Sequence, residues 1–331
     1  MGKSKTDFDV YELIKMVEAA RTREDINNIF AFAAQSGKRI SPVNDIWFTI
    51  AACIFAMGAF WLYGYAGAER YVNESGLVAM SFALGAAIWC GKTFIDYCLS
   101  FADIGPVLLR LDAMLDNQLF YTAAPSLQEL DSRYSEFARG ERKREIEYYV
   151  QGYTKSKLRY YVYQFRYEQT HKAQYKTLYS NRYRNGLILE GFTASDIQIL
   201  ASDQHASLKY TGVNYPISWS TESIKFNKHF KIYAADEMSV AKFLKPAVIL
   251  AIEKFSKRFN KVNIEVDSKM RVCISFEMKD LLKVKASRRL RDLQSIKDSL
   301  KGKAALPLLD EVLSFAETLM SYTNNNFAGK R

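Results

Sequence analysis

The sequence predicts an α+β protein in which a two-helix transmembrane hairpin precedes a cytosolic domain of antiparallel strands and helices. Two long uncharged stretches occur in the first hundred residues, apolar and polar residues alternate with period two after residue 147, and apolar stripes at helical spacing follow later. Because 49% of the 331 residues are hydrophobic, the chain has enough apolar surface for a core and is not disordered. Four cysteines are too few for a small disulfide scaffold.

The first uncharged stretch is the strongest signal in the sequence. Residues 46–68 contain no charged side chain, and as a helix rising about 1.5 Å per residue they are long enough to cross a hydrocarbon core of about 30 Å. The second stretch starts at residue 76 and extends to residue 95 if Lys92 reaches the headgroups with its ammonium. We therefore expect transmembrane helices at 46–68 and 76–95; the alternative is a buried hairpin in a soluble protein.

Basic residues orient this hairpin. The loop between the two stretches contains one basic residue, Arg70, whereas several flank the outer ends of the hairpin. These are Arg21, Arg23, Lys38 and Arg39 before the first helix and Lys92 and Arg110 after the second. Basic residues accumulate on the cytoplasmic side, so both termini should face the cytoplasm.

The segments on either side of the hairpin have helical patterns. Residues 1–40 should form amphipathic helices, because apolar residues recur from Val10 to Val17 at one-turn spacing and a second stripe follows Thr22. These stripes would pack on the protein itself, lie on the bilayer or bind a partner helix. Residues 96–147 should form membrane-proximal helices, one of them starting at a capping box of Ser126 and Glu129.

Residues 148–285 should form the α+β cytosolic domain. Its first part holds ten of the chain's 21 tyrosines between Tyr148 and Arg184, together with a basic excess. The basic residues are Lys155, Lys157, Arg159, Arg166, Lys172, Lys176, Arg182 and Arg184. Tyrosine interleaved with Lys or Arg suits single-stranded nucleic acid or anionic lipid headgroups, because rings stack and cations neutralise phosphate. The alternative is structural, with tyrosines filling a half-buried sheet and basic residues on its wet face.

The second part of this domain has clearer elements. We expect a strand over 230–233, then a helix of about twenty residues that Pro246 kinks or restarts. Val262 to Val266 and Val272 to Phe276 alternate on either side of a turn, which predicts a hairpin. The C-terminal segment, 286–331, should contain a helix from about Pro307 to Tyr322.

The segment from Phe230 to Leu282 resembles the closing half of an uncharacterised bacterial domain-of-unknown-function family of membrane proteins, often encoded beside LemA-type proteins. Members of that family share the layout of a cytosolic start, a hydrophobic hairpin, a mixed soluble domain and a last helix. The resemblance implies a protein of the bacterial inner membrane. It implies no catalytic residue.

No pattern in the sequence indicates catalysis. The three histidines, His171, His205 and His229, are far apart and lack the spacing of metal ligands, and no phosphate loop, nucleophile elbow or C-x-x-C pair is present. We therefore expect no catalytic, cofactor-binding or metal-binding residue and no enzymatic activity.

The leading hypothesis is a membrane-anchored interaction or scaffold protein with membrane lipid and a protein as partners. Small residues at Ala79, Ala83 and Ala87 would let the second span pack against its neighbour or a second copy of the chain. The first alternative is that the basic aromatic sheet binds anionic lipid headgroups or, less favoured, single-stranded nucleic acid. The second is a transport-associated role for Asp96 and Asp103, beside the bilayer, where carboxylates could serve a proton or cation path or simply face water.

Overall fold

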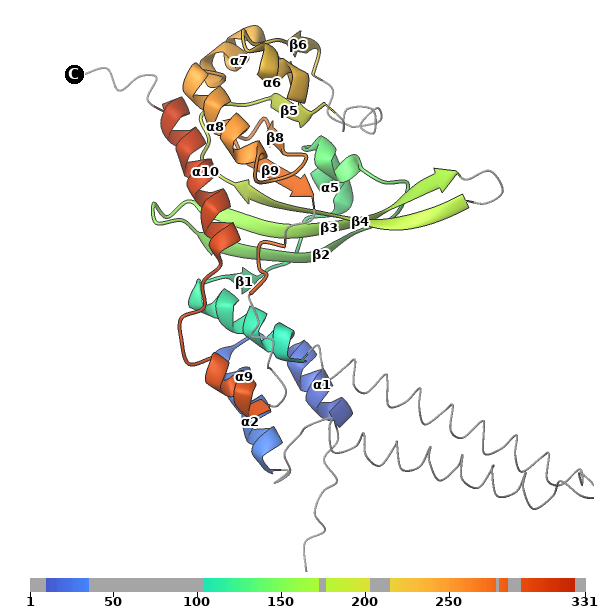
Figure 1. Cartoon of the computed structure of the whole chain (residues 1–331), viewed down its shortest axis with the longest axis vertical. Coiled ribbons are helices and arrows are strands. Elements are labelled where there is room, and N and C mark those ends of the chain that lie inside the picture. The colour runs from blue at the N-terminus through green and yellow to red at the C-terminus, as the bar shows by residue number, and fades with distance from the viewer. Residues whose placement is uncertain are drawn as a thin grey trace, which may run out of the picture. The chain divides into compact units, whose positions relative to one another are not determined.

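The computed structural model in Figure 1 describes residues 10–35, 104–172, 177–202, 215–277, 280–284 and 293–324. The expected transmembrane helices at 46–68 and 76–95 lie outside these residues. Among the helices that are described, none combines the length and the apolar character needed to span a bilayer. The chain divides into two compact units, Met1–Ala113 with Val284–Ala304 and Met114–Lys283 with Ala305–Arg331.

The described part of the first unit is helical. It contains α1 (Val10–Ala19), α2 (Arg23–Gln35), helical residues 104–113 and α9 (Leu293–Ser299). The expected stripe is buried, with Leu13 and Val17 at most 3% exposed. Thr22 precedes α2 and accepts a hydrogen bond from the backbone N of Asp25 (3.1 Å). This contact caps the helix at the position that the sequence indicates.

The second unit is built on one sheet, and it confirms the α+β class with an antiparallel sheet. Its described strands are β1 (Phe120–Tyr121), β2 (Arg142–Tyr153), β3 (Arg159–Lys172), β4 (Thr177–Leu189), β5 (Ile197–Ala201), β6 (Ile217–Trp219), β7 (Phe230–Ala234), β8 (Asn263–Val266) and β9 (Val272–Glu277). They lie in the order β1-β2-β3-β4-β9-β8-β5-β7-β6, and neighbouring strands are antiparallel.

One face of the sheet is apolar. Residues directly opposite each other share a face, so the register aligns one row across successive strands. This row comprises Val150, Val162, Leu187, Ile274, Ile264, Ile199 and Ile232. Each of these side chains is at most 1% exposed. The alternation that predicts strands after residue 147 therefore corresponds to a sheet whose apolar face is buried.

Helices cover the apolar face. They are α7 (Glu237–Phe243), α8 (Pro246–Ser256) and α10 (Pro307–Asn324), while α6 (Ile224–His229) precedes β7. Phe255 of α8 stacks on Phe315 of α10 with ring centroids 3.9 Å apart, and its ring edge meets Phe276 of β9. Pro246 is the first residue of α8, so the expected long helix is two helices with an internal start at the proline.

The opposite face carries a short connecting segment. The capping box begins α5 (Leu127–Asp131), but the chain then turns and forms a 3-10 helix, η1 (Ser135–Ala138). Tyr134 and Phe137, which continue the helical spacing in the sequence, are buried against sheet tyrosines instead of extending α5. The charged run that follows belongs to β2, which begins at Arg142, before the alternation becomes visible.

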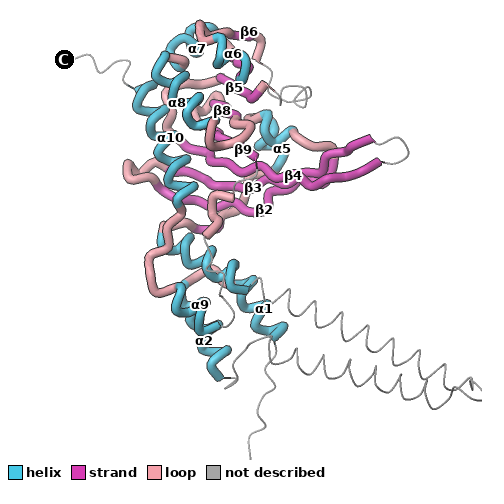
Figure 2. The backbone as a smooth tube through the Cα atoms, viewed as in Figure 1, coloured by secondary structure: helices cyan, strands magenta, loops and turns pink. Residues whose placement is uncertain are grey.

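A two-stranded ribbon extends from the sheet. Residues 169–172 of β3 and 177–180 of β4 pair with each other, whereas β2 pairs with β3 only as far as Glu168 and β9 pairs with β4 only from Arg184 onward. Figure 2 shows these two strands running past the other strands of the sheet. We call residues 169–172 and 177–180 the ribbon.

Candidate functional site

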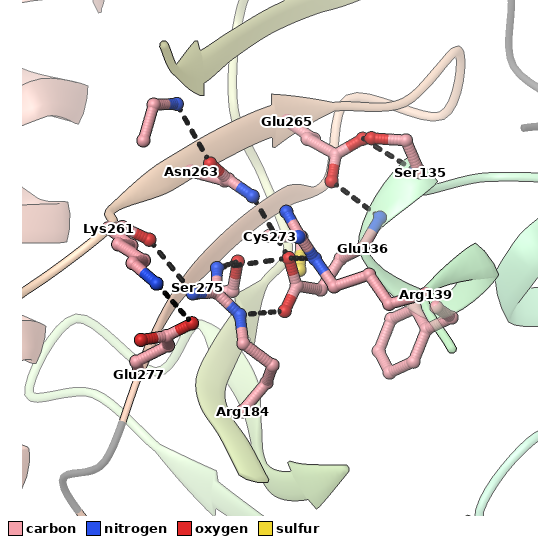
Figure 3. Close-up of polar contacts among 12 residues, drawn as sticks. Ser135, Glu136, Arg139, Arg184, Lys261, Asn263, Glu265, Cys273, Ser275 and Glu277 are labelled. Carbon is pink, nitrogen blue, oxygen red and sulfur yellow. Dashed lines mark hydrogen bonds and ion pairs between the residues drawn. The ribbon is translucent and has the colours of Figure 1, made fainter. Parts of the chain in front are cut away.

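A cluster of polar and charged side chains is buried between η1 and the sheet, on the face opposite the apolar row (Figure 3). It comprises Ser135, Glu136 and Arg139 from the η1 segment and Arg184, Gln198, Asn263, Glu265 and Ser275 from the sheet. Each of these side chains is at most 4% exposed. Buried charges are costly unless they are paired, so their partners decide what the cluster does.

Glu136 and Arg184 form the centre of the cluster. Arg184 Nε and Nη2 donate to the two carboxylate oxygens of Glu136 at 2.5 and 3.1 Å, and Arg184 Nη2 also donates to Ser275 Oγ. Arg139 Nε donates to Glu136 Oε2 at 3.0 Å. Burial alone would raise the pKa of Glu136, but the charges of Arg139 and Arg184 outweigh it and lower the pKa to about 2. Glu136 is therefore an ionised carboxylate held by two guanidinium groups.

Glu265 on β8 fastens the start of η1 to the sheet. Its Oε2 accepts hydrogen bonds from the backbone N and the hydroxyl of Ser135 at 2.7 and 2.6 Å, and its Oε1 accepts one from the backbone N of Glu136 at 2.9 Å. Gln198 Nε2 donates to Oε2 as well. Burial raises the pKa of Glu265 to about 7; the Ser135 hydrogen bonds oppose the shift, and the nearby charge of Glu136 adds to it.

The cluster resembles a structural clamp more than a reaction centre. Its carboxylates and guanidinium groups are engaged with each other or with backbone groups, and they are sealed from solvent. Cys273, beside the cluster, lies 3.3 Å from the Tyr163 hydroxyl, and burial raises the pKa of its thiol, which disfavours the reactive thiolate. Within the described residues, no group of His, Cys, Asp and Glu is arranged to hold a metal ion.

The structure spreads the predicted basic residues over the length of β3 and β4. Lys155 and Lys157 lie in the turn between β2 and β3, and Arg159 is the first residue of β3, whereas Lys172 is its last. At about 3.3 Å per residue, the first and last residues of β3 are roughly 40 Å apart. Lys176 lies outside the described residues. The described members of the set are therefore spread along the strands and not gathered at one point.

Three of the predicted basic residues are engaged in ion pairs, one of them Arg159, whose Nε lies 4.0 Å from Glu190 Oε2. Arg184 is in the buried cluster, and Arg166 pairs with both Glu145 and Glu147 of the neighbouring strand β2. The count of basic and acidic residues between 148 and 184 does not include Glu145 and Glu147, because they belong to the charged run that precedes this segment in the sequence. The pairing of β2 with β3 places them beside Arg166. That charged run, placed beside β3 by a hairpin, is the signal that the sequence analysis missed.

The remaining predicted sites cannot be located in the structure. Ala79, Ala83, Ala87, Asp96 and Asp103 lie outside the described residues. The buried cluster was not predicted, because Glu136, Glu265 and Arg184 are far apart in the sequence and none belongs to a motif. Alternation with Val262, Ile264 and Val266 puts Glu265 on the other face of its strand, where the local sequence pattern gives no reason to expect burial.

A family model described as "Protein of unknown function (DUF3137)" matches residues 195–306, roughly a third of the chain. This match contains the segment 230–282 and agrees with its resemblance to an uncharacterised domain family. It runs from the strand β5 through β9 to the start of α10, and it excludes the ribbon and η1. No curated protein and no solved structure matches the chain. The expected genetic association with LemA-type proteins stays a prediction.

Proposed function

We propose that this chain is a membrane-anchored interaction protein without enzymatic activity, and that the ribbon is the element that contacts its partner. The anchor is supported by the sequence, in which residues 46–68 and 76–95 have the length and composition of a transmembrane hairpin. The contact element is supported by the structure. The observation that carries the proposal is the extension of β3 and β4 beyond the sheet.

A two-stranded ribbon is costly to keep ordered by itself. An isolated hairpin is at best marginally stable in water, and strands normally gain stability from a third strand or a covering helix. The ribbon has large side chains that water can reach, since Leu178 is 45% and Tyr179 52% exposed. Such side chains on a projecting element are available to a partner, whereas the charged cluster is enclosed within the fold.

The second candidate function is binding of an anionic ligand by the basic aromatic sheet. One segment of the sequence, residues 169–189, supports it. From Gln169 to Leu189 the sequence contains four basic residues and no acidic residue. Arg184 is buried, and the other three, Lys172, Lys176 and Arg182, belong to the ribbon, its connecting loop and its base. The turn residues Lys155 and Lys157 lie at the opposite end of β3 and would not take part.

The experiment is a pull-down of the full chain in detergent, with co-purified protein and lipid identified by mass spectrometry. It compares the natural chain with a ribbon-shortened variant in which residues 170–179 are replaced by Asn-Gly. Gln169 and Ser180 are opposite each other, so a two-residue turn can join them. We expect the variant to keep its thermal unfolding temperature and to lose its stoichiometric partner.

A matched control places the substitutions at the other end of the same strands. The variant with Lys155→Gln and Lys157→Gln changes the turn between β2 and β3 and leaves the ribbon intact. It should retain the partner. Capture of the same partner by the ribbon-shortened variant would refute the assignment of the ribbon as the contact element.

A further inference from the structure

The charges around the ribbon are distributed unevenly. Toward the body of the sheet, the described acidic residues of β2 and β3 are paired with bases: Glu168 with Lys143 at 2.7 Å, and Glu145 and Glu147 with Arg166. Beyond the pairing of Arg142 with Glu168 the ribbon sequence has no carboxylate. In the sequence, residues 169–180 contain Lys172 and Lys176 and no acidic residue, so this segment has a net positive charge.

Aromatic and basic groups are interleaved at the base of the ribbon. The guanidinium carbon of Arg142 lies 5.0 Å from the centroid of the Tyr179 ring, within the range of a cation–π contact. Tyr183, four residues nearer the body of the sheet on the same face of β4, is 40% exposed. Leu178 is on the other face of β4, so both faces present apolar surface to solvent.

We propose that the ribbon rests on a membrane surface rich in anionic phospholipid headgroups. This inference rests on the proposed function, because it takes the ribbon as the contact element and names the chemistry of what it contacts. Lys and Arg near an anionic leaflet are attracted to its negative potential, and tyrosine rings are favoured at the headgroup level because one end is apolar and the other polar. The proposed anchor would tether the same chain to a bilayer, which makes a membrane surface available to the ribbon.

The observations favour lipid over nucleic acid as the occupant. A single-stranded nucleic-acid platform needs rings spread along a groove on which successive bases stack. The described tyrosines of β3 that would form such a platform, among them Tyr163 and Tyr167, are buried beneath α5 and η1. The ribbon and its base have two exposed rings, Tyr179 and Tyr183 on one face of β4, which suits insertion of a narrow edge among headgroups. Other exposed rings, Phe120, Tyr121 and Tyr153, lie elsewhere in the second unit.

The test uses the full chain in lipid nanodiscs and follows amide hydrogen exchange in peptides that cover residues 169–183. One set of discs contains phosphatidylcholine alone, and the other an equal mixture of phosphatidylcholine and phosphatidylglycerol. We expect exchange of these peptides to be slower by about tenfold in the anionic discs, and the difference to shrink as salt rises to about 0.5 M. Equal exchange in the two kinds of disc would overturn the proposal.

Two triple variants with the same change in charge localise the effect. The first variant changes the ribbon and its base and should abolish the difference between the discs; it combines Arg142→Gln, Lys172→Gln and Arg182→Gln. The second variant changes the opposite end of β3 and should retain the difference; it combines Lys155→Gln, Lys157→Gln and Arg159→Gln. Equal loss in both variants would show general attraction of a basic protein and overturn the proposal. If the half-buried Arg182 proves necessary for folding, the double variant without that change serves instead.

The outcomes separate this inference from the proposed function. Capture of a protein partner through a ribbon that anionic discs do not protect would overturn the lipid assignment and leave the interaction role in place. Protection of the ribbon by a single-stranded oligonucleotide but not by anionic discs would likewise overturn it, in favour of nucleic acid.

Discussion

Two buried glutamates of the same cluster, Glu136 and Glu265, have pKa values shifted in opposite directions. Glu136 has two arginine partners and stays ionised, whereas Glu265 has uncharged donors and the negative charge of Glu136 nearby. The number of cationic neighbours therefore decides the protonation of each carboxyl, even though burial disfavours the charge of both.

Glu136→Gln should be strongly destabilising. The substitution leaves Arg139 and Arg184 buried without a negative partner, and removal of one partner from a buried ion pair typically costs about 3–5 kcal/mol. We expect a loss near the lower end of that range, because the Gln amide oxygen can still accept one hydrogen bond. The measurement is the free energy of unfolding from a urea titration in detergent. Glu145→Gln, at the partly exposed pair with Arg166, is the control and should change it little.

Glu265 should make stability fall as pH rises. Its pKa is about 7 in the folded state and near 4.5 when unfolded, so the folded protein holds the proton more tightly. This contribution to stability is fully present below about pH 4.5 and is lost as pH rises through about 7. Glu136 has the opposite sign, because its lowered pKa gives a contribution that is lost only as pH falls from about 4.5 through about 2.

The pH effect is measured as the unfolding temperature at pH 5 and pH 8 for the natural chain and for Glu265→Gln. The variant cannot ionise at this position, so its unfolding temperature should decline less between the two pH values. A decline of the same size in both proteins would show that other groups account for it.

At the scale of elements, sequence patterns located most of the regular structure of the second unit but not its connections. The strand at 230–233, the hairpin of β8 and β9, and the last helix are found where alternation and helical spacing predict them. Local spacing also predicted a helix through Phe137, and there tertiary packing prevailed: the rings of Tyr134 and Phe137 pack into the tyrosine-rich core, and Glu265 holds the backbone of η1. The buried cluster includes contacts between residues more than a hundred positions apart, such as Ser135 and Glu265, and local sequence patterns do not predict such contacts.

The short helix α5 should depend on its cap. Ser126 Oγ accepts a hydrogen bond from the backbone N of Glu129 at 3.1 Å, and a helix of five residues has few other hydrogen bonds. Ser126→Ala should therefore lower the free energy of unfolding by about 1 kcal/mol, and Ser126→Asp should restore it because Asp caps equally well. Chemical denaturation of the three proteins checks this prediction. An equal loss in both variants would place the role of Ser126 elsewhere than in capping.

At the scale of the whole molecule, the described helices and strands account for two compact units, and the proposed anchor lies in the sequence between α2 and the helical residues 104–113. The strand β1 pairs with β2 only at Val150 and Gln151, so no described strand covers the outer side of β2 near its start. Charged residues from Arg142 to Glu147 and two irregularities in the register with β3 discourage strand addition there. The ribbon is built from β3 and β4, and neither β2 nor β9 pairs with its residues, so the outer side of each of its two strands lacks a described strand partner.

Deletion of residues 46–95 tests the anchor directly. If the two uncharged stretches span the bilayer, the natural chain should stay with membranes after an alkaline carbonate wash, and the deletion variant should move to the soluble fraction with its sheet intact by circular dichroism. The orientation adds a second requirement, because tags at both ends of the natural chain should resist protease added to spheroplasts, where the periplasmic face of the inner membrane is accessible, and be cleaved only after lysis. A deletion variant that still resisted the carbonate wash would mean that another segment holds the chain in lipid. The amphipathic helices α1 and α2 would then be the first to examine, since the ribbon binds by charge and should be released by the wash.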